Sequence, residues 1–167
     1  MTTFIFMKAT ALAPSNIAFI KYWGKRDEGL RIPMNGSVSM NLSNLLTTTT
    51  VEFNPNFKDD MITINHELLT YSSSDPDLSG ESRSFSSRQA GTISLERVVE
   101  HLNRIRNLVK INYRAKVVSK NNFPTSTGLS SSASGFAALT LAASKGAGLK
   151  LSEKELSILA RQGSGSA

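Results

Sequence analysis

The sequence predicts an α+β domain in which helices back a mixed, mostly antiparallel sheet. Apolar residues alternate at the period of a strand through most of the first half of the chain, and from Thr92 onward they recur at the period of a helix. Another alternating segment, Ile111 to Val117, then separates two helical segments. With 167 residues and 40% hydrophobic content, the chain can bury the core of one ordinary domain.

The first half of the chain predicts strands. Alternation and β-branched residues indicate four of them: Lys8 to Ala13, Ala18 to Trp23, Ser37 to Leu42 and Thr47 to Phe53. Apolar residues on both sides of Asn65-His66 predict a hairpin with its turn at that pair. The stretch from about 72 to 90 is rich in serine and has almost no apolar side chains, so we expect a flexible loop there.

The second half predicts three helices around one strand. The first helix buries a single stripe formed by Leu95, Val98, Val99, Leu102 and Ile105. An apolar helix over Gly135 to Ala143 ends near Lys145-Gly146 and Gly148. A capping box from Ser152 to Glu155 begins the last helix, which runs to Arg161.

Composition narrows the class of partner. The formal charge of +6 suits a polyanion, which could be a nucleic acid, a membrane surface or a phosphorylated metabolite. The basic clusters are not interleaved with aromatic residues, which disfavours nucleic acid. No apolar run is long enough to span a membrane, and no leader with a clear cleavage site precedes the first strand. We therefore expect a cytoplasmic protein with neither nucleic acid nor membrane as its partner.

The absence of cysteine excludes disulfides, zinc–thiolate clusters and thiol nucleophiles. The two histidines, His66 and His101, cannot build a metal site between them, and each is expected at the surface or on a helix face.

The segment from Pro124 to Ala133 has the chemistry of a phosphate-binding loop. Gly128 allows the backbone to bend without a Cβ clash, and the amides of Ser130 to Ser132 would begin a helix whose positive end favours an anion. The hydroxyls can add hydrogen bonds and a ligand for magnesium. A capped loop without a ligand fits the same residues, and the lysine of the Walker pattern is absent. At the other end, Gln162 to Ala167 fits either an engineered flexible tail or a second glycine–serine loop.

Several strings together resemble the mevalonate diphosphate decarboxylase family, within the superfamily of galactokinases, homoserine kinases and mevalonate kinases (GHMP kinases). They are Ala13 to Ala18, Lys21-Tyr22-Trp23-Gly24-Lys25-Arg26, Asn121 to Thr125, Gly128 to Ala133 and Arg161 to Ala167. The likeness covers nearly the whole chain and is weakest between Phe53 and Gln89. It implies that residues 1–167 form the GHMP-kinase-type N-terminal domain that binds ATP and substrate, truncated at its C-terminal end. The superfamily shares this fold with RNA-binding ribosomal domains.

The resemblance also implies a reaction in the mevalonate pathway of isoprenoid biosynthesis. ATP, with Mg²⁺, phosphorylates the tertiary hydroxyl of mevalonate 5-diphosphate, and loss of phosphate and carbon dioxide leaves isopentenyl diphosphate. Homodimers are common in the family. The sequence leaves open a relative that decarboxylates mevalonate 5-phosphate, a mevalonate-type kinase, and a non-catalytic module that binds anions or RNA.

Site residues are carried over from the family position by position. Lys21, Ser132 and Asn16 match catalytic positions, and the hydroxyl of Ser132 also matches a contact to Mg²⁺. The substrate-binding positions are Tyr22, Lys25, Arg97, Ser164 and Ser166. The ATP-binding positions are Gly128, Leu129, Ser130, Ser131, Ser132 and Ser119. Trp23 is expected to pack rather than to recognise a ligand. In the family, the general-base aspartate and the arginine that binds the substrate carboxylate lie outside this chain, so we expect the isolated chain to be inactive.

Overall fold

The computed structural model describes residues 7–71, 95–124 and 131–167. The strands are β1 (Met7–Ile20), β2 (Lys25–Asp27), β3 (Ile32–Pro33), β4 (Val38–Asn54), β5 (Asp60–Ile64), β6 (Glu67–Tyr71) and β7 (Arg114–Asn121). The helices are α1 (Leu95–Val109), α2 (Ser131–Gly146) and α3 (Glu153–Gly163). The loop expected over about 72 to 90 lies outside the described residues, as do Gly128, Leu129 and Ser130.

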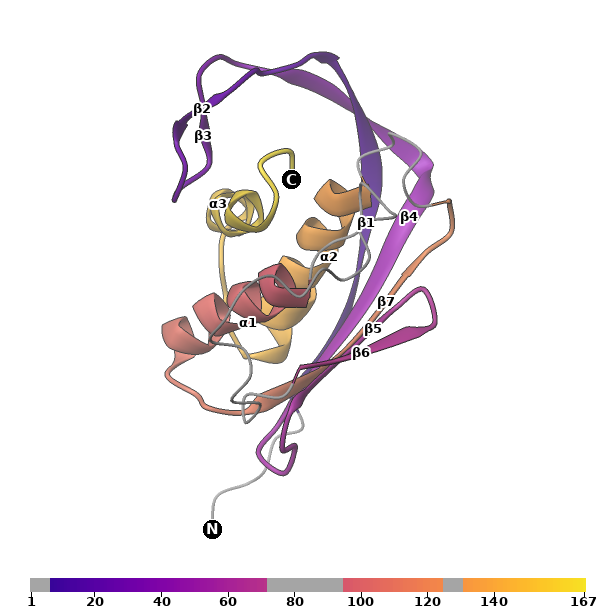
Figure 1. The fold of residues 1–167 in the computed structure, drawn as a ribbon, viewed down its shortest axis with the longest axis vertical. Coiled ribbons are helices and arrows are strands. Elements are labelled where there is room, and N and C mark those ends of the chain that lie inside the picture. Colours follow the sequence, from indigo (N-terminus) through magenta and orange to yellow (C-terminus); the bar gives the residue numbers. More distant parts are fainter. Residues whose placement is uncertain (1–6, 72–94, 125–130) are drawn as a thin grey trace, which may run out of the picture.

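Five of the strands form one sheet in the order β1-β4-β7-β5-β6, and β2 pairs with β3 in a small separate ribbon. Within the sheet, β5 and β7 run parallel while the other neighbours are antiparallel. The helices cover one face of this sheet (Figure 1). The predicted architecture, a mixed and mostly antiparallel sheet backed by helices, is confirmed.

The edge strand β1 is longer than the sequence predicted. Instead of separate strands, β1 and β4 form one ribbon whose pairing runs from Met7 opposite Phe53 to Ile20 opposite Val38. Pro14 lies in the gap left between the two predicted strands, and a proline costs no ladder hydrogen bond on an edge strand where its nitrogen faces outward. The interruption appears as a register shift after Pro14. The prediction that a strand extends to Trp23 was wrong, because β1 ends at Ile20.

The predicted hairpin is present. Asn65 and His66 have φ values of 47° and 75°, as a two-residue turn with left-handed central residues requires. The Asn65 amide N–H donates to the Ser119 carbonyl (2.9 Å), and its side-chain oxygen accepts from the Asn121 amide (2.9 Å). The turn is therefore attached to the end of β7, the strand that precedes the predicted phosphate loop.

The helices follow their sequence signals closely. Val98, Val99, Leu102 and Ile105 of α1 are buried in the core, as the apolar stripe predicted. The capping box of α3 is formed, with Ser152 accepting from the Glu155 amide while the Glu155 carboxylate accepts from the Ser152 amide. The Ser152 hydroxyl also donates to the Glu155 carboxylate (2.6 Å), and this hydrogen bond, followed by that from the Ser152 amide, lowers the pKa of the Glu155 carboxyl. In the described ranges, no helix combines the length and hydropathy that crossing a membrane requires.

His101 lies on the buried face of α1 and is fully enclosed. Thr140 Oγ1 donates to the Phe136 carbonyl (2.6 Å), so it accepts from His101 Nε2 (2.8 Å), and the proton of the neutral ring resides on Nε2. The ring also meets Phe136 edge to face, with centroids 5.4 Å apart. Burial, with a smaller effect from Arg104, lowers the pKa of His101 from 6.5 to about 4.

This environment predicts acid sensitivity. Because the unfolded chain takes up a proton at His101 near pH 6.5 and the folded chain only near pH 4, the free energy of unfolding falls as pH decreases through that window. The full effect is about 3 kcal/mol. Urea unfolding from pH 7 to pH 4 measures it. His101→Gln keeps a donor for Thr140 and removes the titration, so its profile should be flatter. Identical profiles for the two proteins would contradict this assignment.

Candidate functional site

The segment after α3, Gly163 to Ala167, is the place where most of the sequence-predicted site residues meet. Helix α3 ends when the Ser164 amide donates to the Ala160 carbonyl (2.9 Å), and the Ala167 amide then donates back to the Ser164 carbonyl (2.9 Å). The segment forms a tight turn beneath the arch made by the C-terminal end of β1 and the N-terminal end of β4 (Figure 1). A glycine–serine turn held in this way is an ordered part of the fold.

Arg97 reaches this segment from the first turn of α1. Its Nη2 donates to the Gly163 carbonyl at 2.6 Å, and its guanidinium carbon lies 5.2 Å from the centre of the Phe136 ring. Its Nε is buried and has no hydrogen-bond partner among the described residues. Burial, together with the nearby charge of Arg31, lowers the pKa of Arg97. The guanidinium therefore keeps an unused donor in a partly desolvated position.

Ser132 and Ser164 face each other across the start of α2. Their hydroxyl oxygens are 3.3 Å apart, and Ser164 is buried. Ser132 lies in the first turn of α2, where backbone amides lack helical partners and the helix dipole is positive. Hydroxyls and free amides at such a position suit a phosphate or carboxylate.

Tyr22 and Asn16 contact the remaining part of the segment. The Asn16 side-chain amide donates to the Ser166 carbonyl at 3.2 Å. The Tyr22 hydroxyl lies so close to Gly165 that an added Cβ would overlap it. The far end of β1, the residues just after it, and the glycine–serine turn are therefore one connected structure.

The structure does not bring every predicted residue to this turn. Lys21 Nζ donates to the Ala18 carbonyl (3.2 Å), and Lys25 pairs with Glu28 (2.6 Å) near the β2–β3 ribbon. The Ser119 hydroxyl is hydrogen-bonded to Thr49 (2.9 Å) within the sheet. Ser131 begins α2.

One expectation near these residues was wrong. Trp23 is 80% exposed and does not pack into the described part of the protein. It follows the end of β1, where the chain has already left the sheet, so no layer of the fold covers it.

Sequence reasoning missed the residues that hold the turn. Phe136 is fully buried and contacts both Arg97 and Gly163. Arg161 Nε donates to the Leu30 carbonyl at 3.2 Å, which connects α3 to the turn before β3. The alternating glycines at 163 and 165 were the available signal, because residues without side chains are needed where aromatic rings press against backbone.

The chain also matches a known protein family. Residues 13–167 match the family described as the diphosphomevalonate decarboxylase-like N-terminal domain. The chain belongs to this family. The resemblance inferred from the sequence strings is confirmed, and the α+β fold agrees with that of the family's solved structures.

Individual relatives give the same result. The chain is 42% identical over 163 residues to the diphosphomevalonate decarboxylase of Gibberella zeae, a match that covers 96% of this chain and 40% of that protein. The mevalonate diphosphate decarboxylase from Staphylococcus aureus has a TM-score of 0.78 at 39% identity, covering 98% of this chain and 43% of that one. MDDEF in complex with MVAPP, AMPPCP and magnesium has a TM-score of 0.77 at 40% identity, with 98% and 43% covered. The chain thus spans about two fifths of the length of these relatives.

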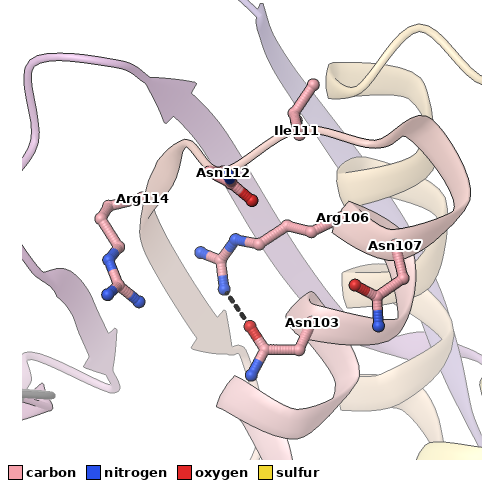
Figure 2. Close-up of a pocket in the computed structure, with 6 residues that line it drawn as sticks. All are labelled: Asn103, Arg106, Asn107, Ile111, Asn112 and Arg114. Atoms are coloured by element: carbon pink, nitrogen blue, oxygen red, sulfur yellow. Dashed lines mark hydrogen bonds between the residues drawn. The ribbon is translucent and has the colours of Figure 1, made fainter.

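A pocket of about 220 Å³ lies elsewhere on this decarboxylase-like domain, between the end of α1 and the start of β7. Figure 2 shows its polar lining, in which Arg106 Nη1 donates to Asn103 at 2.7 Å. The other Arg106 nitrogens donate to the Tyr113 carbonyl (2.8 Å) and to the buried carboxylate of Asp60 (2.5 Å). The pocket is at the opposite end of β7 from the predicted phosphate loop, so it is separate from the turn at Gly163.

The two glycines of the turn predict different outcomes on substitution by alanine. At Gly163 an added Cβ overlaps the buried Phe136 ring, which cannot move aside, so Gly163→Ala should lower the free energy of unfolding by about 1–3 kcal/mol. At Gly165 it overlaps only the Tyr22 hydroxyl, and the next atom, Tyr22 Cζ, is 3.5 Å away. Gly165→Ala should therefore cost less, and Tyr22→Phe should restore most of the loss.

Urea unfolding of the variants tests these expectations. Gly36→Ala is the matched control, because no atom lies within 4 Å of a Cβ added at that position. Equal losses at positions 36 and 163 would contradict the packing of Phe136 against the turn.

Proposed function

We propose that this chain supplies the ATP phosphate loop and part of the substrate site of an enzyme that converts mevalonate 5-diphosphate to isopentenyl diphosphate with ATP. The family supports the reaction class, since the relatives are diphosphomevalonate decarboxylases. The observation that carries the assignment of the site is the meeting of Arg97, Ser132 and the Gly163 turn at the start of α2.

Positive charge at this turn supports the binding of a diphosphate. Arg97 has a buried Nε without a partner among the described residues, and Arg31 is close enough to lower its pKa. Arg161 is held beside the same turn through the Leu30 carbonyl. Guanidinium groups suit the planar, multidentate recognition of phosphates. We assign the diphosphate of the substrate to Arg97, with Tyr22, Ser164 and Ser166 contributing hydroxyls and Lys25 contributing charge after release from Glu28.

The hydroxyls at the start of α2 suit the phosphates of ATP. Ser132 presents an oxygen beside free helix amides, and Gly128 to Ser131 supply the loop that precedes it in the sequence. Magnesium takes oxygen ligands and is commonly bound through one or two protein groups together with substrate phosphates. The donor set therefore fits Mg²⁺ held by ATP and the Ser132 hydroxyl. Bound there, the ion would neutralise charge on the phosphates.

Phosphoryl transfer requires positioning and charge neutralisation more than a protein nucleophile. The tertiary hydroxyl of the substrate attacks the terminal phosphorus of ATP, its proton passes to the general base that we expect in the remaining part of the enzyme, and ADP leaves. The new phosphate then departs while the carboxylate is lost as carbon dioxide and its electrons form the double bond. Asn16 orients the substrate from its position against Ser166. Lys21 donates to the Ala18 carbonyl in this structure. When substrate binds, Lys21 contacts the substrate instead and offsets the negative charge on the transferring phosphoryl group.

The setting that we propose is cytoplasmic. The chain contains no cysteine, in keeping with a reducing compartment. The partners are mevalonate 5-diphosphate and ATP, and we expect a homodimer of the full-length enzyme rather than a complex with nucleic acid or membrane.

The experiment measures ATP-dependent carbon dioxide release from mevalonate 5-diphosphate by the full-length enzyme that contains this chain. Ser132→Ala should lower kcat by about 100-fold, because it removes a donor at the transferring phosphate. Ser144→Ala is the matched control, since this serine is also on α2 and lies at the opposite end of the helix. Faster turnover of mevalonate 5-phosphate, or phosphorylation of mevalonate without decarboxylation, would contradict the proposed substrate or reaction.

The isolated chain should show no turnover under the same conditions. It spans about two fifths of its relatives' length, and the family's general base and carboxylate-binding arginine are expected in the remaining part. Isotopic carbon dioxide release from labelled substrate, with the full-length enzyme as positive control, measures this. ATP-dependent release by the isolated chain would contradict it.

A further inference from the structure

Phe136 connects the groups to which we assign the substrate diphosphate. Its ring is fully buried on α2 and is contacted from both neighbouring helices. The Arg97 guanidinium of α1 lies over the ring at 5.2 Å from its centre, and the backbone of Gly163 at the end of α3 presses against the same ring. Arg97 and Gly163 are in turn joined by a 2.6 Å hydrogen bond. Ring, guanidinium and carbonyl thus form a closed triangle of contacts.

The ring cannot easily change its place. His101 meets it edge to face at 5.4 Å, and His101 is itself fixed by its hydrogen bond to Thr140. Thr140 is one turn along α2 and donates to the carbonyl of Phe136 itself. The orientation of the ring is therefore determined by side chains from α1 and α2 that do not reach the turn.

Arg97 depends on this ring for its orientation. Among the described residues, its one hydrogen bond is that to Gly163, and its buried Nε has none. A cation over an aromatic face is attracted by the negative face of the ring, more strongly where water is excluded. An aliphatic side chain of similar volume would fill the space but would not attract the guanidinium. The position of Gly163, and with it that of the Ser164 hydroxyl, is set by the same ring.

We propose that Phe136 is a positioning residue of the diphosphate site, which it serves by holding Arg97 and the turn at Gly163–Ser164 in one geometry. This inference rests on the function proposed above. Phe136 touches no substrate, so its effect is expected in the binding of the diphosphate and not in that of ATP.

Phe53 offers a matched control for the loss of a buried ring. It is also buried, and Arg106 lies over it at 5.7 Å. Arg106, however, donates to Asp60, Asn103 and Tyr113 near the pocket at the far end of β7. Phe136→Leu and Phe53→Leu thus each remove a buried ring that an arginine covers, but only the first lies at the Gly163 turn.

The experiment compares these variants with wild type in the full-length enzyme, using urea unfolding, kcat, and KM for each substrate. Both variants should lose stability. Phe136→Leu should raise KM for mevalonate 5-diphosphate about tenfold and leave KM for ATP within about twofold, whereas Phe53→Leu should change neither. In the double variant Arg97→Met with Phe136→Leu, KM should rise by less than the product of the two single effects, because the ring acts in part through Arg97. If the Phe136→Leu protein does not fold, Phe136→Met is used in its place.

Equal KM values in the Phe136 and Phe53 variants, or additive effects in the double variant, would overturn the positioning role. Calorimetric titration with inorganic pyrophosphate measures binding at the Arg97 site without turnover. Phe53→Leu should bind pyrophosphate as wild type does, and Phe136→Leu should bind it more weakly. Wild-type enzyme that binds pyrophosphate but does not turn over mevalonate 5-diphosphate would overturn the proposed function. A tenfold loss of pyrophosphate affinity confined to the Phe136 variant would still support the positioning role.

Discussion

The pairing of β1 with β4 is the constraint on which the rest of this structure depends. The two strands stay paired from Met7 opposite Phe53 to Ile20 opposite Val38. Helix α2 packs mainly on these two strands, so the start of α2 and the far end of β1 are fixed to one support. That common support places Ser132 of α2 and Asn16 of β1 around the same turn.

The composition of α2 explains how it lies so close to the ribbon. Its buried face is made largely of small residues, and a Cβ added at Gly146 would be 3.5 Å from the carbonyls of Met7 and Val51. Phe136 is the one aromatic residue on this helix. Its ring extends toward α1 and α3, where it packs against His101, Arg97 and Gly163. Small residues therefore face the sheet, and one aromatic residue joins the helices to one another.

Polar groups are buried at the turn at some cost to stability. An unpaired buried donor such as Arg97 Nε typically costs about 1–3 kcal/mol, and charged groups cost more. Under the proposed function this cost has a use, because donors left unpaired in the fold are available to an anionic ligand. The packing of α2 on the ribbon and the core around Leu102 and Ile105 offset it.

The sequence by itself determined the local elements, because their signals act over neighbouring residues: the apolar stripe of α1, the capping box at Ser152 and the turn at Asn65-His66. It also identified the family, since the string around Lys21 is specific and several weaker strings accompany it. It did not reveal that Pro14 lies within one long strand, because a strand tolerates proline mainly at a sheet edge or a bulge, and strand order is a tertiary property. Nor could it place Phe136 beneath Arg97 and Gly163. Those residues are far apart in the chain, and only the packing of three helices on one face of the sheet brings them together.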